Sequence, residues 1–99
     1  MRDEPFQPCV YLMASQRNGT LYCGSTSTPI KRIWDHKEGV GSVFTRKYGV
    51  TLLVWYEFHD LMAAAIKREL QIKEWKRRWK LELIEAANPE WRDLYQDWF

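Results

Sequence analysis

The chain has 99 residues, which is enough for one domain with its own core and too few for two. Its 45% apolar and 15% aromatic residues exclude a disordered tail, and no run approaches the roughly 20 apolar residues of a membrane helix. The net charge is only +2, so any surface that binds nucleic acid must be local. The chain begins without the apolar segment of a signal peptide, and its two cysteines form no metal-binding pattern. We therefore expect a cytoplasmic protein with free thiols.

The first part of the chain predicts a β-hairpin. Residues 1–7 are polar and predict a loose leader. Cys9–Ala14 is apolar on both faces, which is typical of a buried central strand. Asn18-Gly19 is a strong hairpin signal and predicts a return strand over Thr20–Gly24.

The register of this hairpin decides which side chains share a face. If the loop has two residues, Ser15 pairs with Tyr22. Tyr11 has the same parity as Ser15, so the two tyrosines are expected on one sheet face. The same count places Cys9 and Cys23 on opposite faces, which argues against a disulfide.

A helix is expected from Thr28 to about Glu38. Thr28 is a favourable N-cap, Pro29 suits the first helical position, and Gly39 suits the position just after the helix. Arg32 and His36 are four residues apart and therefore lie on one face of this helix. A cation and a proton carrier on one rigid face are suited to phosphate chemistry.

The rest of the chain completes an α/β (α+β) domain over residues 1–99, with a three-stranded, mainly antiparallel sheet flanked by helices. A glycine-punctuated loop with Arg46 and Lys47 precedes the third strand. Asp60 is positioned to cap the next helix, and Asn88-Pro89 ends the helix after that. The expected elements are a strand over Val50–Phe58, helices over 61–75 and 77–87, and a last helical turn or two over 90–98.

Glu69 is the unusual residue of the helix over 61–75. The apolar face of that helix is expected to consist of Leu61, Met62, Ala65, Ile66 and Ile72. Glu69 falls inside this face, where a carboxylate is costly unless a cation, a metal ion or hydrogen bonds compensate it. Two interpretations stay open. Glu69 pairs with Lys73 at the edge of the face, or it is a metal ligand or general acid/base in a cleft.

Together these residues resemble the GIY-YIG nuclease superfamily, in particular its small single-domain members. The first motif corresponds to Cys9-Val10-Tyr11, and the second to Tyr22-Cys23-Gly24. The family's arginine, histidine and helical glutamate correspond to Arg32, His36 and Glu69. The resemblance covers nearly the whole chain, in order.

The chain departs from the family pattern in three places. The first motif keeps only Tyr11, and the family's Asp-Leu helix entry is Thr28-Pro29. Some members have a further active-site asparagine after the glutamate, and Asn88 is the one asparagine downstream of Glu69. We favour a structural, helix-ending role for Asn88.

The resemblance implies hydrolysis of DNA phosphodiester bonds with one magnesium or manganese ion, held by Glu69. It implies that Arg32 neutralises the scissile phosphate. Tyr11 is the favoured group to orient or deprotonate the attacking water, and Tyr22 would contact the phosphate or the water. His36 would accept the tyrosine proton or bind phosphate, and spacing does not say which tyrosine is the base.

A single domain has no accessory DNA-binding module, so single-stranded, branched or damaged DNA, as in DNA repair, is the expected substrate. Basic residues near the site that are candidates for DNA contact are Lys31, Arg46, Lys47 and Arg78. A basic-aromatic stretch, Trp75–Lys80, either contacts nucleic acid or packs its tryptophans in the core. The alternatives are an inactive nucleic-acid-binding module and a protein-interaction domain, and the six tryptophans leave a homodimer open.

Overall fold

The strand predicted to be central, β1 (Cys9–Ala14), lies in the middle of an antiparallel sheet of order β2-β1-β3. The structure is a computed structural model and describes residues 4–99. The edge strands are β2 (Leu21–Thr26) and β3 (Leu52–Phe58). Every side chain of β1 is buried, as its uniformly apolar sequence predicts. The three-stranded antiparallel sheet confirms the expected fold class.

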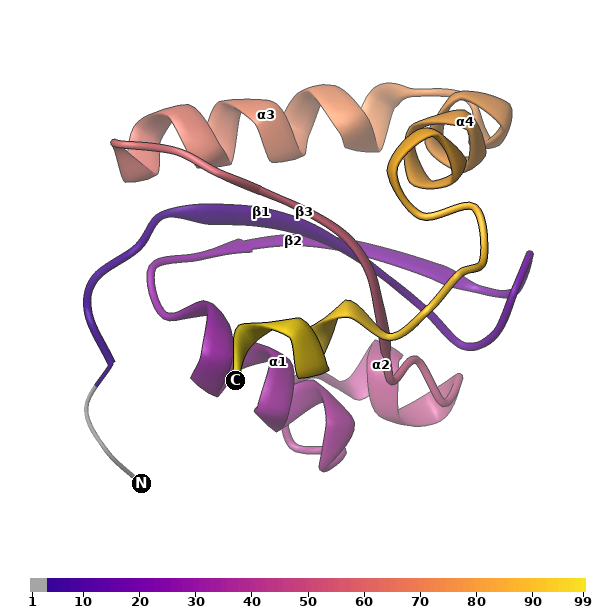
Figure 1. Cartoon of the computed structure of the whole chain (residues 1–99), viewed down its shortest axis with the longest axis horizontal. Helices are drawn as coiled ribbons and strands as arrows, with labels where there is room; N and C mark the ends of the chain where they lie inside the picture. The colour runs from indigo at the N-terminus through magenta and orange to yellow at the C-terminus, as the bar shows by residue number, and fades with distance from the viewer. Residues whose placement is uncertain (1–3) are drawn as a thin grey trace.

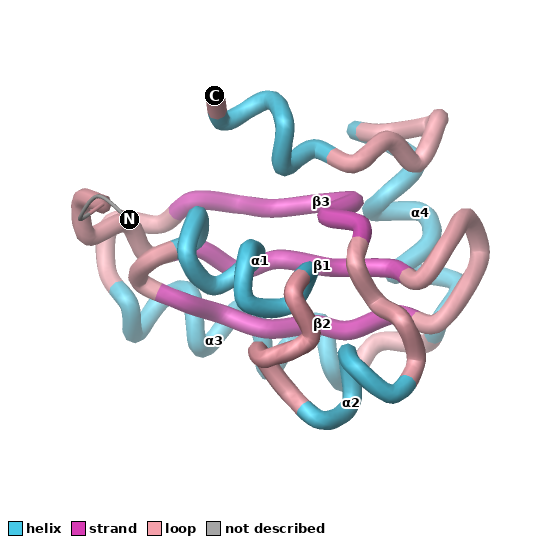
Figure 2. Tube along the Cα trace, turned by 90° about the horizontal axis from the view of Figure 1, so that it is seen from below, coloured by secondary structure: helices cyan, strands magenta, loops and turns pink. Residues whose placement is uncertain are grey.

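Helices cover both faces of the sheet (Figure 1). On one face lie α3 (Met62–Glu74) and α4 (Arg77–Ala87). On the other face lie α1 (Pro29–Lys37), α2 (Val43–Lys47) and the C-terminal 3₁₀ helix η1 (Leu94–Trp98). Figure 2, which views the domain from the side of α1, shows that α1 crosses the sheet and that α2 lies beyond the β2 edge. Among residues 4–99, none of the helices is long and apolar enough to span a membrane.

The side chains of β1 alternate between two cores, because both faces of the sheet are covered. The core toward α3 and α4 contains Val10, Leu12, Ala14, Cys23, Val54, Trp55, Ile72, Ile84 and Trp91. The core toward α1 and η1 contains Tyr11, Met13, Ile33, Val50, Leu53 and Tyr95. The register between β1 and β3 shifts at Leu12/Met13, and consecutive Val54 and Trp55 both join the first core.

The hairpin differs from the predicted register by two residues. Ser15 pairs with Thr20 (N···O 3.0 Å), and Tyr22 lies opposite Met13. The loop is therefore four residues long, and Asn18 adopts the left-handed conformation with φ 58°. A shift of two keeps the parity of the strand, so Tyr11 and Tyr22 do share a face, as predicted. The cysteines are also on opposite faces, and both are free.

The cap of α1 was predicted from the wrong residue. Thr28 occupies the N-cap position, but its side chain makes no capping hydrogen bond. Instead the Glu4 carboxylate accepts hydrogen bonds from the backbone N–H groups of Ile30 (3.0 Å) and Lys31 (2.7 Å). Of the loose leader expected over residues 1–7, residues 1–3 lie outside the described part. Glu4 is held at the helix, and the Gln7 backbone N–H donates to Ser27 (2.7 Å).

The expected loop over Gly39–Gly49 contains a helix, α2. Its N-cap is Ser42, whose Oγ accepts a hydrogen bond from the Thr45 N–H (3.0 Å), and Gly49 follows its end with φ 63°. Three smaller corrections concern element ends. Strand β3 begins at Leu52, α3 is preceded by Leu61 and not by Asp60, and the last turn is a 3₁₀ helix. In α3, Ile66 is 44% exposed, so the buried face is narrower than predicted.

Asn88 ends α4, as its Asn-Pro sequence predicts. Its side chain is buried and donates to the backbone oxygens of Val54 (3.1 Å) and Arg92 (2.9 Å). It also accepts a hydrogen bond from the Arg92 N–H (3.0 Å). These three bonds tie the end of α4 to β3 and account for the residue structurally.

Candidate active site

Tyr11 and His36 form a buried hydrogen-bonded pair. Tyr11 projects from β1 and His36 from the last turn of α1, and each is 1% exposed. The Tyr11 hydroxyl lies 2.8 Å from His36 Nε2. Burial, together with the nearby Arg32 charge, lowers the pKa of His36 to about 4. Burial also raises the pKa of Tyr11, so both groups are neutral near pH 7.

A residue outside the predicted set, Thr45, fixes the orientation of the imidazole. Its Oγ1 lies 3.1 Å from His36 Nδ1. The same hydroxyl lies within reach of both the Ser42 carbonyl oxygen (3.3 Å) and the Ser42 Oγ (2.8 Å), and when its one hydrogen goes to Ser42 it accepts from Nδ1–H. In this tautomer, Nε2 has a free lone pair, and the Tyr11 hydroxyl donates to it. Tyr11, His36 and Thr45 therefore form a directed chain of hydrogen bonds.

Tyr22 and Arg32 lie beside this chain. The Tyr22 ring centroid is 5.0 Å from that of His36 and 6.3 Å from that of Tyr11. Partial burial by itself lowers the pKa of Arg32. The Tyr11 and Tyr22 oxygens have the larger effect in sum, so the pKa of Arg32 is raised. The Arg32 guanidinium thus faces both hydroxyls. Four of the five predicted catalytic residues are gathered on one face of the sheet.

Two glycines allow this close packing. Gly24 lies opposite Tyr11 in the sheet, and a Cβ there would be 2.5 Å from the Tyr11 hydroxyl oxygen. A Cβ at Gly41 would be 2.6 Å from His36 Nδ1. The glycine of the second motif is therefore required sterically, because any side chain there would displace the tyrosine.

Glu69 approaches from the other face of the sheet. Its carboxylate is 15% exposed and forms a hydrogen bond with the Ser25 hydroxyl and an ion pair with Lys73 (2.5 Å). The hydrogen bond with Glu69 is the main cause that raises the pKa of Lys73. The ion pair with Lys73 is the first of the two interpretations of Glu69, and the role as metal ligand or general acid/base stays a prediction. Ser25 was missed by the sequence analysis, which had no signal for a serine one residue beyond the second motif.

The edge position of β2 connects the two faces. Burial is the main cause of the raised pKa of Tyr11, but the Glu69 charge also contributes to it. Tyr22 contributes in the same way to the pKa of Lys73. Since β2 is an edge strand, its open side borders both faces of the sheet.

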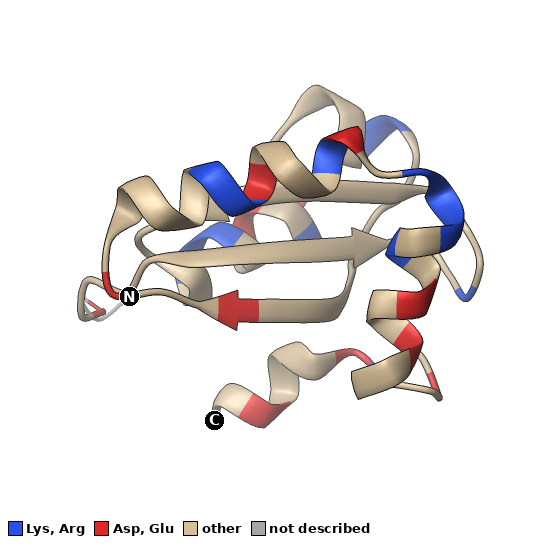
Figure 3. Ribbon diagram, turned by 90° about the horizontal axis from the view of Figure 1, so that it is seen from above, with Lys and Arg blue, Asp and Glu red and all other residues tan. Residues whose placement is uncertain are grey.

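The predicted DNA-contacting residues are dispersed. Lys31 forms an ion pair with Asp35 (3.0 Å), and the Lys47 ammonium lies 5.4 Å from the Tyr48 ring centroid on α2. Arg46 is exposed on α2, and Arg78 is exposed on α4. Figure 3 shows lysine and arginine gathered where α3 ends and α4 begins. In that region Trp79 is 43% exposed, so it is not the core anchor that the sequence allowed.

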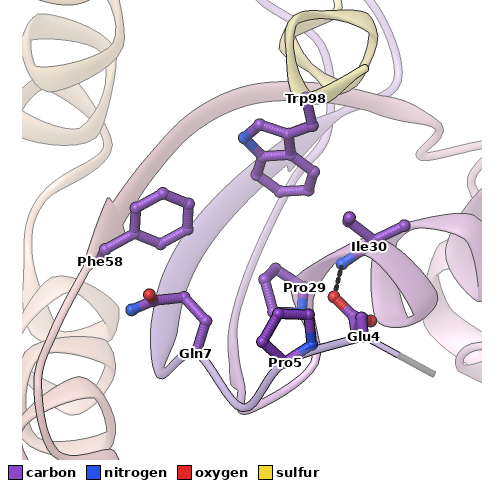
Figure 4. A pocket seen from close by; sticks show the side chains of 7 residues that line it. All are labelled: Glu4, Pro5, Gln7, Pro29, Ile30, Phe58 and Trp98. Carbon is purple, nitrogen blue, oxygen red and sulfur yellow. Dashed lines mark hydrogen bonds between the residues drawn. The ribbon is translucent and has the colours of Figure 1, made fainter.

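A cavity of about 260 Å³ lies away from these residues, between the N-terminal segment, the start of α1 and η1 (Figure 4). It is lined by Glu4, Pro5, Gln7, Pro29, Ile30, Phe58 and Trp98. Glu4 is already engaged in capping α1. None of the predicted catalytic residues belongs to this lining.

The residues at the β2 edge offer few ligands for a metal ion. Within residues 4–99, no three His, Cys, Asp or Glu side chains are grouped so that they could enclose an ion. Magnesium commonly binds through one or two carboxylates and keeps several waters. Glu69 and the adjacent Ser25 hydroxyl are hard oxygen donors of this type. A divalent ion bound here would therefore keep most of its waters, and Lys73 would have to leave the carboxylate.

Comparison with known proteins identifies the family of the chain. A family model described as the GIY-YIG catalytic domain matches residues 7–82. The chain therefore belongs to the GIY-YIG family, whose catalytic domain is a nuclease domain. Nucleases of this family act on DNA and generally use a divalent metal ion.

Within that family, the matching relatives are UPF0213 proteins. The chain is 38% identical over 79 residues to a UPF0213 protein of Clostridium perfringens, covering 80% of this chain and 84% of that protein. It is 32% identical over 89 residues to one of Aeromonas salmonicida, covering 90% of this chain and 64% of that protein. The solution NMR structure of a UPF0213 protein from Bacillus halodurans matches with a TM-score of 0.55 and 26% identity, covering 88% of this chain and 92% of that one.

Proposed function

We propose that the protein is a metal-dependent DNA endonuclease that cuts single-stranded, branched or damaged DNA. The observation that supports it most is the directed hydrogen-bond chain Tyr11–His36–Thr45, with the Arg32 cation beside the Tyr11 hydroxyl. A structural tyrosine requires no histidine acceptor in a fixed tautomer. A tyrosine that removes a proton from water does require one.

In the proposed mechanism, Tyr11 relays a proton and does not become a phenolate. Burial disfavours a free phenolate, so the Tyr11 oxygen accepts the proton of the attacking water while its own proton moves to His36 Nε2. Burial and the Arg32 charge both hold the pKa of His36 low in the free protein. A bound phosphate offsets the Arg32 charge and therefore makes His36 a stronger base. Thr45 accepts from Nδ1–H and keeps Nε2 aimed at Tyr11.

Arg32 and Tyr22 act on the phosphate. The Arg32 guanidinium offers several N–H donors to the scissile phosphate and balances the charge that develops on its oxygens. Tyr22, which lies next to Arg32 and His36, donates its hydroxyl hydrogen to a phosphate oxygen or positions the water. Tyr22 has no histidine hydrogen bond of its own, and for this reason we assign the base to Tyr11.

Glu69 holds the metal ion in this proposal, with Ser25 fixing the orientation of the carboxylate. The bound ion supplies Lewis-acid stabilisation of the phosphate and of the leaving oxygen. Lys73 neutralises the Glu69 carboxylate in this structure and would have to leave it for an ion to bind there.

Cleavage of labelled single-stranded, flap and duplex DNA, with magnesium, manganese or EDTA, tests the proposal. Tyr11→Phe removes only the hydroxyl, and Glu69→Gln removes the charge but keeps an oxygen for Ser25. We expect each to lower the cleavage rate about 100-fold or more. Glu57→Gln is the matched control, because Glu57 is a carboxylate that pairs with Arg68 (3.1 Å) away from the candidate site.

Four results would contradict the proposal. Cleavage that persists in Glu69→Gln means that this residue does not hold the metal ion. Preferential cutting of plain duplex overturns the substrate class. A folded wild-type protein that binds DNA without cutting it is an inactive binding module, and one with no salt-dependent affinity for DNA is a protein-interaction domain.

A further inference from the structure

Helix α2 presents two aromatic rings to solvent. Phe44 and Tyr48 are four residues apart and lie on one side of the helix, with ring centroids 4.8 Å apart. Phe44 is 41% exposed and Tyr48 is 47% exposed. The one buried residue of this short helix is Thr45, which contacts His36. The two rings are therefore not needed to fill the core under α2.

These rings continue a series that begins in the candidate active site. The Tyr22 ring centroid is 5.0 Å from that of His36 and 6.0 Å from that of Phe44. Tyr48 follows Phe44 at the outer end. The interplanar angle between Tyr22 and Phe44 is 35°, so their faces are only moderately tilted. A ligand held at Tyr22 and Arg32 therefore has an adjacent aromatic surface on α2.

The two charged residues of α2 itself are both cations. Lys47 lies over the Tyr48 ring, Arg46 precedes it on the same helix, and residues 39–56 contain no aspartate or glutamate. A flat aromatic surface bordered by cations is complementary to a nucleobase attached to a phosphate backbone. An uncharged apolar partner would leave these cations without a counterpart.

We propose that Phe44 and Tyr48 form a binding site for an unpaired nucleobase, with the neighbouring phosphate of the same strand at Arg32. The inference deepens the proposed function and rests on it for the position of the phosphate. In a duplex, each base face is covered by its neighbours in the stack, so the site accepts a base only from a single strand or one displaced from the duplex. The site thus selects unpaired DNA for this nuclease domain.

Binding is measured separately from cleavage, by fluorescence anisotropy in EDTA. The probes are a labelled oligodeoxyadenylate of about 12 nucleotides and an abasic strand of the same length and charge. The test variant is Phe44→Ala with Tyr48→Ala in the full chain. The matched control is Phe58→Ala, because Phe58 is 48% exposed and lies on β3, at the opposite edge of the sheet. Circular dichroism and gel filtration report folding and oligomeric state.

We expect the wild-type protein to bind the adenylate strand about 5- to 150-fold more tightly than the abasic strand. The double variant loses this preference and keeps its affinity for the abasic strand, while Phe58→Ala keeps both. Equal affinity of the wild type for the two strands would overturn the inference. So would a double variant that loses both affinities equally, that unfolds, or that changes from a dimer to a monomer.

The outcomes also separate this inference from the proposed function. Base-dependent binding through α2 without any cleavage would refute the nuclease and leave the base site in place. Cleavage at the same rate in the wild type and the double variant, with no preference for a strand that has bases, would refute the base site and leave the nuclease in place.

Discussion

The buried imidazole of His36 makes a quantitative prediction about stability and pH. Burial and the Arg32 charge lower the folded-state pKa of His36 to about 4 from its ordinary value of 6.5. Between these two values, the unfolded chain binds a proton that the folded protein does not bind, so stability falls as the pH falls. A pKa difference of that size corresponds to about 3 kcal/mol in the free energy of unfolding. Most of this stability is lost by about pH 4.5.

Urea unfolding between about pH 7 and pH 4.5, followed by tryptophan fluorescence, measures this effect. The comparison is His36→Gln, which has no titrating group at this position. We expect it to be less stable than the wild type near neutral pH, and to lose about 2–3 kcal/mol less on acidification. Parallel pH dependences would refute the reasoning, because they would mean that His36 titrates alike in the folded and unfolded chains. A histidine NMR titration of the folded protein gives the same pKa directly.

Two other predictions concern residues that position the site and the fold. Gly24→Ala places a Cβ against the Tyr11 hydroxyl, and we expect it to lower the free energy of unfolding by about 1–3 kcal/mol and to reduce cleavage strongly. The control is Gly49→Ala, whose backbone is strained at φ 63° but whose Cβ would have no atom within 4 Å. We expect it to lower the urea midpoint and to keep cleavage. Asn88→Ala removes the three hydrogen bonds of a buried side chain, and we expect a loss of about 2–3 kcal/mol in urea unfolding with cleavage unchanged. Loss of cleavage by a folded Asn88→Ala protein would indicate a role for Asn88 in the site.

The sequence was sufficient where a local pattern determines the structure. The continuous apolar run Cys9–Ala14 predicted a central strand, because only a strand covered on both faces tolerates it. The parity of Tyr11 and Tyr22 was also predicted correctly, although the hairpin loop is four residues and not two. The error of two residues was harmless because side chains alternate with a period of two. An error of one residue would have moved Tyr22 to the α3 face.

The sequence was insufficient where the partner is distant in the chain. The acidic cap of α1 comes from Glu4, 26 residues before Ile30, and no local pattern predicts that contact. Thr45 contacts His36 from a segment that was expected to be a loop, since its three glycines obscured a five-residue helix. Ser25 and Glu69 are 44 residues apart and meet only because α3 packs on β2. These three contacts depend on tertiary packing.

The edge position of β2 explains how so small a domain combines these groups. In a central strand, the two faces are separated by neighbouring strands on both sides, so Glu69 on α3 and Arg32 on α1 could not meet at one substrate. At β2 the sheet ends, and Gly24 has no side chain to cover the Tyr11 hydroxyl. The Arg32 side and the Glu69 side therefore border the same edge strand, β2, while Tyr11 and His36 themselves are buried. An edge of this kind suits a long, flexible polyanion better than a small molecule, because a polyanion binds along an open surface while a small ligand needs enclosure.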